Sequence, residues 1–212
     1  PALGADLPIK DAACVPVLNN GNHCTSNALA IKAVSLEPAR NHCNLGETFD
    51  LNVGITFGSG RSRSAAQRYN IGVWIGENGE PAIGGTQCTF TGLQPATSNN
   101  ALLNLTGGSG PFRLINNDSC GDILDTEQTY VEFQANEVLC QDKNGNGKLD
   151  IPLVVAWQNN ANKDLCSGPT DVESYLPRQS SACREFESYD LDIITVEPPA
   201  EIEVYKTPTP RF

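Results

Sequence analysis

The chain has 212 residues and a formal net charge of −11, because 25 Asp and Glu outnumber 14 Lys and Arg. Such a chain lacks the clustered basic side chains that neutralise phosphates, which argues against nucleic-acid binding and against binding to anionic membranes. No apolar run approaches the roughly 20 residues needed to cross a bilayer. The sequence therefore predicts no nucleic-acid partner and no membrane insertion, and its length suffices for a core of its own.

Apolar and polar residues alternate along several segments, which is the pattern of strands with one face in a core. The clearest runs are 49–57, 69–75 and 131–133, and weaker ones are 29–36, 87–93, 152–157 and 191–196. Asn-Gly and Gly-rich turn pieces separate them, and no segment keeps a helical period of comparable length. The pattern predicts an all-β fold, an antiparallel β-sandwich of jelly-roll or immunoglobulin-like type with long disulfide-stapled loops.

Composition divides the chain into three parts. Residues 1–26 are predicted to be an N-terminal arm with a local disulfide, residues 27–198 the sandwich, and residues 199–212 an extended strand and Pro/Thr linker. Within the sandwich, 97–117 and 159–188 lack a clear period and are expected to be long loops. Apolar residues in the arm and alternation near the C-terminus would allow either end to add to a neighbour's sheet edge.

The eight cysteines are an even set without any C-x-x-C pair. This spacing excludes zinc ribbons and thioredoxin-like centres, and it favours four disulfides formed outside the reducing cytosol. Roughly 105 pairings are open to eight cysteines. Our expectation is pairing of nearest neighbours: Cys14 with Cys24, Cys43 with Cys88, Cys120 with Cys140, and Cys166 with Cys183. The predicted location is extracellular or at a cell surface.

The run D-K-N-G-N-G-K-L-D from Asp142 to Asp150 has the spacing of a calcium loop. Calcium takes about six to eight oxygen ligands, and a glycine at the sixth position permits the sharp turn. The predicted ligands are Asp142, Asn144, Asn146, the backbone carbonyl of Lys148, and Asp150. Calcium is therefore the predicted cofactor. The alternative is an Asn-Gly-rich hairpin without an ion, because the same residues favour tight turns.

The predicted loop stands outside a helix-loop-helix frame. Its twelfth position is Leu153, where an EF-hand would supply a bidentate Glu, and a strand pattern follows. Other parts of the chain must then complete the ligand shell, and Asp122 is the first candidate, followed by Asp118, Asp164 and Asp171. Neutral Asn at two positions should lower the affinity, which suits millimolar extracellular calcium.

No catalytic constellation is evident, and we expect the protein not to be an enzyme. The histidines, His23 and His42, each precede a cysteine that is better explained as a half-cystine. Three glutamates could pair across a cleft as in a glycosidase, namely Glu127, Glu132 and Glu137. Alternation with apolar neighbours, however, places Glu132 on a solvated strand face.

Two further features concern sugars. Asn104 and Asn117 lie in N-glycosylation sequons, which matter only if the producing cell glycosylates asparagine. Trp74 and Trp157 are expected in the core, although an exposed pair could stack on a carbohydrate.

Several segments occur together in one order. They are 68–75, 120–123, the run from 138 through the loop to 152, Trp157, and the loop from 166 to 183. In this order they resemble the cysteine-containing β-domains of large secreted bacterial surface proteins, which often precede conserved extracellular repeat domains. The resemblance covers roughly residues 27–206 and differs in the two loop asparagines and in a missing cysteine near 154–157. It implies a surface or matrix location and no established enzymatic activity.

These observations predict a secreted, calcium-binding structural or adhesive surface protein. Its partners would be copies of itself, in a filament assembled by strand addition, or other surface proteins. The alternatives are a carbohydrate-binding module of a larger secreted protein and a secreted hydrolase. A binding module would need exposed aromatic side chains on one face, and a hydrolase would need convergent titratable groups in a cleft.

Overall fold

The structure is a computed structural model that describes most of the chain between residues 9 and 198. The described residues are 9–17, 24–35, 41–59, 67–93, 116, 118–123, 129–161, 165–168, 170–178 and 181–198. The predicted strand and linker of 199–212 lie outside this set, as do both sequon asparagines, Asn104 and Asn117.

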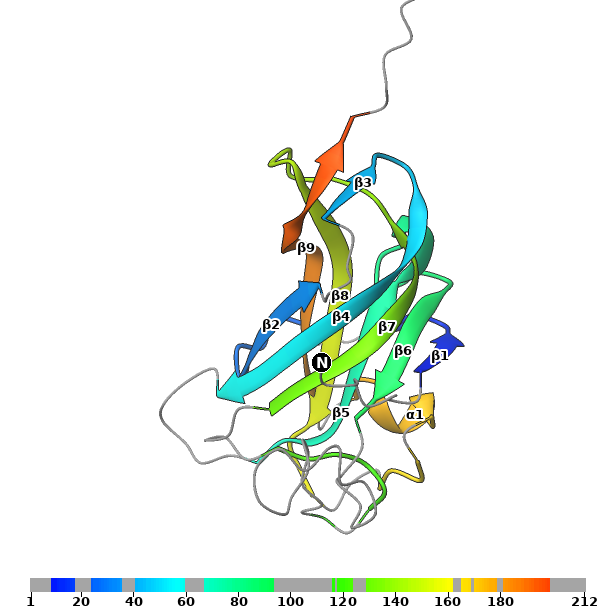
Figure 1. The fold of residues 1–212 in the computed structure, drawn as a ribbon. Coiled ribbons are helices and arrows are strands. Elements are labelled where there is room, and N and C mark those ends of the chain that lie inside the picture. The colour runs from blue at the N-terminus through cyan, green and yellow to red at the C-terminus, as the bar shows by residue number, and fades with distance from the viewer. Residues whose placement is uncertain are drawn as a thin grey trace, which may run out of the picture.

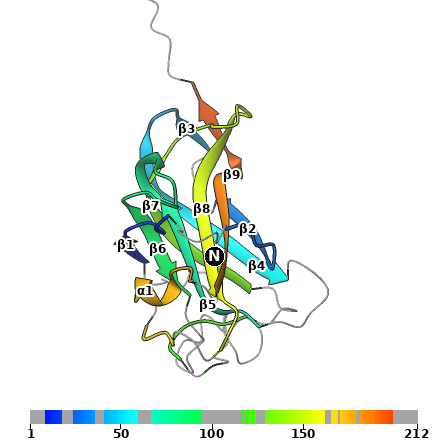
Figure 2. The same cartoon turned by 180° about the vertical axis from the view of Figure 1, so that it is seen from behind.

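Two sheets pack face to face in the described part of the chain (Figure 1 and Figure 2). The strands are β1 (Ile9–Ala12), β2 (Leu29–Ser35), β3 (His42–Asn44), β4 (Thr48–Ser59), β5 (Tyr69–Gly76), β6 (Cys88–Gly92), β7 (Thr129–Leu139), β8 (Lys148–Gln158) and β9 (Ser181–Glu197). A six-stranded sheet has the order β1-β6-β5-β8-β9-β3, and a three-stranded sheet has the order β2-β4-β7. All pairs are antiparallel except β3 with β9. The predicted all-β sandwich is confirmed.

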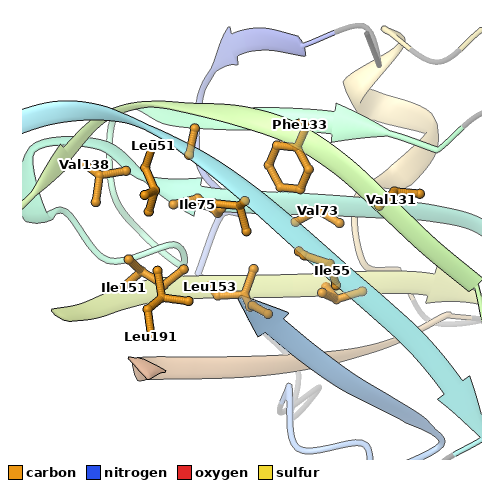
Figure 3. Close-up of a cluster of buried hydrophobic side chains, with 14 of the residues drawn as sticks. Leu51, Ile55, Val73, Ile75, Val131, Phe133, Val138, Ile151, Leu153 and Leu191 are labelled. Carbon is orange, nitrogen blue, oxygen red and sulfur yellow. The ribbon is translucent and has the colours of Figure 1, made fainter. Parts of the chain in front are cut away.

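The main core fills the space between the sheets. In β4, the alternating side chains of Leu51, Val53 and Ile55 are buried while Asn52 is exposed, as the sequence pattern predicts. Figure 3 shows aliphatic side chains of the two sheets converging, among them Ile55 of β4 and Val73 of β5. Each such side chain contributes about 1.5–3 kcal/mol by leaving water, so this cluster holds the sheets together.

A second core covers the outer face of the six-stranded sheet. Trp74, Phe90 and Tyr175 pack there, with ring centroids 4.8 and 5.2 Å apart along the series. Tyr175 belongs to the short helix α1 (Val172–Tyr175), which closes this side together with the segment around Cys14. Strands β5 and β8 are therefore buried on both faces, so the solvated face that the alternation in 69–75 predicts is instead covered by this second core.

Three strands differ from the sequence expectation. The segment 159–188 is not one loop, because β9 begins at Ser181. Most side chains in the first half of β9 are half-buried, so the strand lacks the alternation that would reveal it. The short strand β3 joins the sheet by parallel pairing with the end of β9. Ile9–Ala12, expected in a free arm, pairs with β6 of the same chain.

All four predicted cysteine pairings are wrong. The disulfides are Cys14–Cys88, Cys24–Cys183, Cys43–Cys140 and Cys120–Cys166, so the expected local disulfide of the arm is also absent. The reason is sheet register, which brings together strands that are far apart in sequence. Ala12 lies opposite Cys88 in the β1–β6 pair, and a bridge between Thr25 and Arg184 places Cys24 beside Cys183. Only Cys43, Cys88 and Cys183 lie within strands, and the other cysteines lie in the connecting segments that those pairings bring together.

Candidate cation-binding loop

The predicted calcium loop connects β7 to β8 at one end of the sandwich (Figure 1). Gly145 and Gly147 adopt positive φ values of 75° and 78°, which glycine tolerates best. Just before the loop, Cys140 is crosslinked to Cys43 of β3. At its far end, the carbonyl of Gly147 accepts a hydrogen bond from the N–H of Val196 at 2.9 Å. The loop is thereby fixed to the neighbouring strands.

Asp142 organises the loop from inside. Its carboxylate accepts hydrogen bonds from the backbone N–H groups of Gly145, Asn146 and Gly147 at 2.7, 3.0 and 2.8 Å. The side-chain oxygen of Asn144 accepts from the N–H of Asn146 at 3.1 Å. A carboxylate offers about four acceptor positions, so these three bonds leave room for one further contact.

Asp150 and Asp190 face each other across the β8–β9 pair. Asp150 is fully buried, and its Oδ2 accepts hydrogen bonds from the N–H groups of Lys143 and Asn144 at 2.6 and 3.2 Å. The amide of Asn144 donates to both carboxylates, at 3.2 Å to Asp150 and 2.6 Å to Asp190. The amide of Asn146 donates to Asp190 at 2.8 Å. Two carboxylates and two amides thus converge beside the loop.

Asp190 is the residue that sequence reasoning missed. A hydrogen bond with Asp150, followed by those from Asn144 and Asn146, lowers the pKa of the Asp190 carboxyl, and the charge of Lys148 adds to this. Lys148, the predicted carbonyl ligand, is the first residue of β8 and lies opposite Thr195. In the sequence, Asp190 lies just before the weak strand pattern of 191–196, and nothing there marks it as a ligand. Its position beside the loop follows from the register of β8 and β9.

Asp122 does not join the loop. It lies next to the bridge between Arg68 and Ile123, near the end of β8 that carries Gln158, whereas the loop precedes the other end. Ten residues of strand separate those ends, or about 33 Å. Asp122 is buried, and its two oxygens accept from the N–H groups of Asn70 and Asn116 at 3.3 and 3.4 Å.

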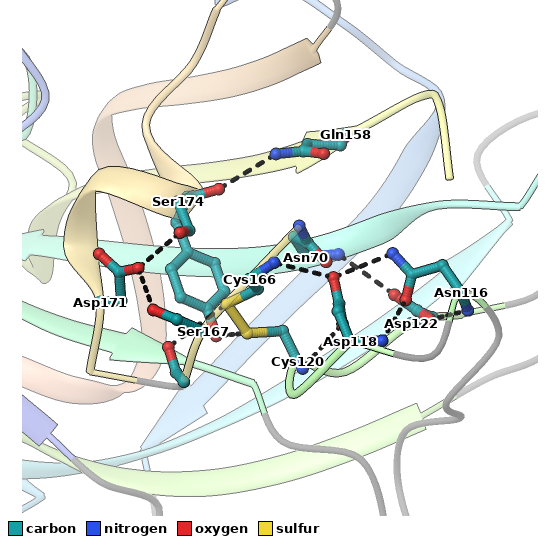
Figure 4. Close-up of a disulfide and its surroundings, with 12 residues drawn as sticks. Asn70, Asn116, Asp118, Cys120, Asp122, Gln158, Cys166, Ser167, Asp171 and Ser174 are labelled. Atoms are coloured by element: carbon teal, nitrogen blue, oxygen red, sulfur yellow. Dashed lines mark hydrogen bonds between the residues drawn. A yellow bond between two sulfur atoms is a disulfide. The ribbon is translucent and has the colours of Figure 1, made fainter. Parts of the chain in front are cut away.

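Two other candidates, Asp118 and Asp171, surround the Cys120–Cys166 disulfide (Figure 4). Asp118 accepts hydrogen bonds from the N–H groups of Cys120 and Cys166 at 2.9 and 3.1 Å. Hydroxyl donors from Ser167 and Ser174 lower the pKa of Asp171. These carboxylates hold backbone in place around the disulfide, while Asp164 lies outside the described residues.

Of the three glutamates considered for catalysis, the structure describes Glu132 and Glu137, and these two contact different residues. Glu132 lies beside Tyr130, whose pKa rises to about 12 through burial and then through its hydrogen bond with Glu132. Glu137 accepts a hydrogen bond from the amide of Asn78 at 2.7 Å. Glu127 and His23 are outside the described residues. His42 is exposed, and its Nδ1 lies 2.8 Å from the side-chain oxygen of its neighbour Asn41.

The predicted core position of Trp74 and Trp157 is confirmed, since both are 0% exposed. They belong to different clusters, so they do not form an exposed surface for stacking on sugars.

Among the described residues, no three Asp, Glu, His or Cys side chains lie close enough to hold a metal ion. In the same part of the chain, no helix is long and apolar enough to cross a membrane.

A separate buried acid, Glu77, gives a test of pH dependence. Its carboxylate is 1% exposed and accepts a hydrogen bond from the hydroxyl of Thr89 at 3.0 Å. Burial raises its pKa, the Thr89 bond opposes this, and the nearby charges of Asp11 and Glu137 raise it further. A raised folded-state pKa means stability that is complete below the unfolded-state value and is lost as pH rises through the folded-state value.

Replacing Glu77 by Gln is therefore expected to leave stability unchanged near pH 4 and to increase it at pH 7, because Gln keeps an acceptor for Thr89 without a buried charge. Urea unfolding of both proteins from pH 4 to 7 measures the difference. A difference that stays constant, or that shrinks as pH rises, would contradict this account of Glu77.

The fold and its crosslinks define a disulfide-rich β-sandwich, and four disulfides with no free cysteine indicate an oxidising environment.

No family model and no curated protein matches the sequence. Among solved structures, one described as "AvmM Catalyzes Macrocyclization in Alchivemycin A Biosynthesis" is similar over 87% of this chain and 97% of that chain, with 11% identity and a TM-score of 0.36. Spo0M, a sporulation control protein from Bacillus subtilis, is similar over 80% of this chain and 49% of that chain, with 12% identity and a TM-score of 0.28. At these TM-scores, neither similarity supports an inference about the function of this chain.

Proposed function

We propose that the protein is a calcium-binding structural or adhesive protein of an extracellular or cell-surface assembly. The observation that supports this most is the position of Asp190 opposite Asp150, with the amides of Asn144 and Asn146 reaching it from the loop. Calcium prefers such a set of carboxylate, amide and backbone oxygens.

The electrostatics of the loop favour a cation. The hydrogen bond between Asp150 and Asp190 requires a proton on one of the two carboxyl groups, because an ionised carboxylate only accepts. When both are ionised the facing carboxylates repel, and the amide N–H donors of Asn144 and Asn146 offset part of that repulsion. Rotation of an amide group exchanges its nitrogen for its oxygen. A calcium ion between the loop, Asp150 and Asp190 would replace the amide donors and be met by the amide oxygens, with Asp142 and the carbonyl of Lys148 completing the shell.

Titration calorimetry with calcium chloride at physiological salt tests this. We expect a dissociation constant of about 10⁻⁴–10⁻³ M, because two of the side-chain ligands are neutral. At tenfold excess of calcium over that constant, the free energy of unfolding should rise by about 1.4 kcal/mol. Absence of both binding heat and thermal stabilisation would leave the loop as a plain hairpin.

Variants make the test specific to these residues. Asp142→Asn and Asp190→Asn should each weaken calcium binding at least about tenfold, because each removes a charged ligand. Glu187→Gln removes the same charge from an exposed position on β9 outside the loop and should bind like the wild type. Equal weakening by all three variants would point to a general charge effect in place of a site.

Self-association by strand addition is a further part of the proposal, in a narrower form. Ile9–Ala12 is already paired with β6 of the same chain, so we place the exchange in the C-terminal strand pattern after residue 198, which lies outside the described residues. Electron microscopy of the protein in calcium would test it, and strictly monomeric particles would count against a filament.

A further inference from the structure

The Cys24–Cys183 disulfide links the N-terminal part of the chain covalently to strand β9. It spans a sequence separation of 159 residues, and both cysteines are buried. Backbone bonds flank it, from Ser26 N–H to the Cys183 carbonyl at 3.0 Å and from Glu185 N–H to the Cys24 carbonyl at 2.8 Å. We propose that this arrangement makes the protein a tension-bearing link, in which a pulling force passes from Cys24 to Cys183 without extending the residues between them.

Strand β9 is suited to that role. It runs along the sandwich from Ser181 to Glu197, an extended length of about 56 Å (Figure 1). Antiparallel pairing with β8 runs from Ser181 to Thr195, with register shifts between the partners of Ile151 and Leu153 and between those of Lys148 and Leu149. A strand that is already extended gains little length under load, and the force passes along β9 itself from Cys183, because the Cys24–Cys183 disulfide leaves β8 outside the load route.

The C-terminal end of β9 is held by further contacts. Its last three described pairs are parallel ones with β3, and the carbonyl of Glu197 accepts from the N–H of Leu45 at 2.9 Å. The Cys43–Cys140 disulfide ties β3 to the residue that follows β7 in the other sheet. The residues that hold this end of β9 lie between Cys24 and Cys183 in the sequence, so they keep the strand in place without being part of the covalent load route. This route depends on the disulfides alone, so it stands whether or not the loop binds calcium.

The connectivity sets how far the molecule can extend. With all disulfides intact, force passes from Cys24 directly to Cys183, and the 159 residues of separation between them carry none. Full reduction would release that hidden length, about 550 Å of extended chain. If only Cys24–Cys183 is missing, the shortest covalent route runs through Cys14–Cys88 and Cys120–Cys166 and is longer by about 40 residues, or about 140 Å.

Single-molecule force spectroscopy on the full chain, attached at both ends, tests the proposal. The oxidised wild type should unfold with about 550 Å less extension than the reduced protein. The double variant Cys24→Ser/Cys183→Ser, oxidised at its other cysteines, should extend about 140 Å further than the oxidised wild type. The matched control Cys14→Ser/Cys88→Ser removes a disulfide outside the loaded route and should match the wild type.

A measurement on the wild type alone covers the case in which a variant does not fold. Thiol added to the stretched, oxidised molecule should cut the loaded Cys24–Cys183 bond first and give a first step of about 140 Å. Oxidised molecules that extend as far as reduced ones, or a control that lengthens as much as the Cys24/Cys183 variant, would overturn the proposal.

Discussion

Replacing Cys43 and Cys140 together by alanine is expected to lower the free energy of unfolding by about 4 kcal/mol. The disulfide closes a separation of 97 residues, and its removal frees the unfolded chain to adopt many more conformations. It also joins β3 of the six-stranded sheet to the end of β7 in the three-stranded sheet, so it is the crosslink between the two layers of the main core.

Urea unfolding under oxidising conditions measures this effect. The slope of the free energy against urea should also rise, because the less constrained unfolded state exposes more surface. Leu45→Ala is the control, since this side chain adjoins β3 and is 50% exposed, and it should change stability by less than about 0.5 kcal/mol. A loss below about 1 kcal/mol in the double variant would mean that packing alone fixes the two sheets.

Trp74→Ala should cost about 3–5 kcal/mol, because it opens a cavity at the centre of the second core. Trp74 is fully buried against Phe90, and Gly72 approaches its ring so closely that a Cβ there would lie 3.0 Å from it. The neighbours are strands and a disulfide-held segment, which have little freedom to collapse into the space.

Trp74→Phe separates the packing effect from any hydrogen bond. The indole N–H has no hydrogen-bond partner among the described residues, so the substitution by phenylalanine removes ring volume and no hydrogen bond. Its cost should stay below about half that of alanine. Leu165→Ala, at a side chain that is 62% exposed, should be nearly neutral. Similar losses for Trp74→Phe and Trp74→Ala would show that the site cannot accept any change of shape.

The sequence itself determined the strands whose two faces meet different surroundings. In β4, apolar residues alternate with Asn52 and other polar ones because one face lies in the core and the other in water. The sequence shows this alternation directly. The spacing of Asp142, Asn144 and Asn146 predicted a calcium loop, with an ion-free Asn-Gly hairpin as the alternative. The structure shows the local hydrogen bonds of a tight loop at these residues, and calcium binding stays a prediction.

Tertiary structure decided whatever depends on which distant strands become neighbours. The cysteine partners, the second core around Trp74 and the parallel edge strand β3 follow from sheet order. Asp190 meets Asp150 only because β9 pairs with β8 in one register. A strand pattern specifies which side of a sheet a residue occupies, but pairing between strands is set by the packing of the whole core, and no local stretch of sequence contains that information.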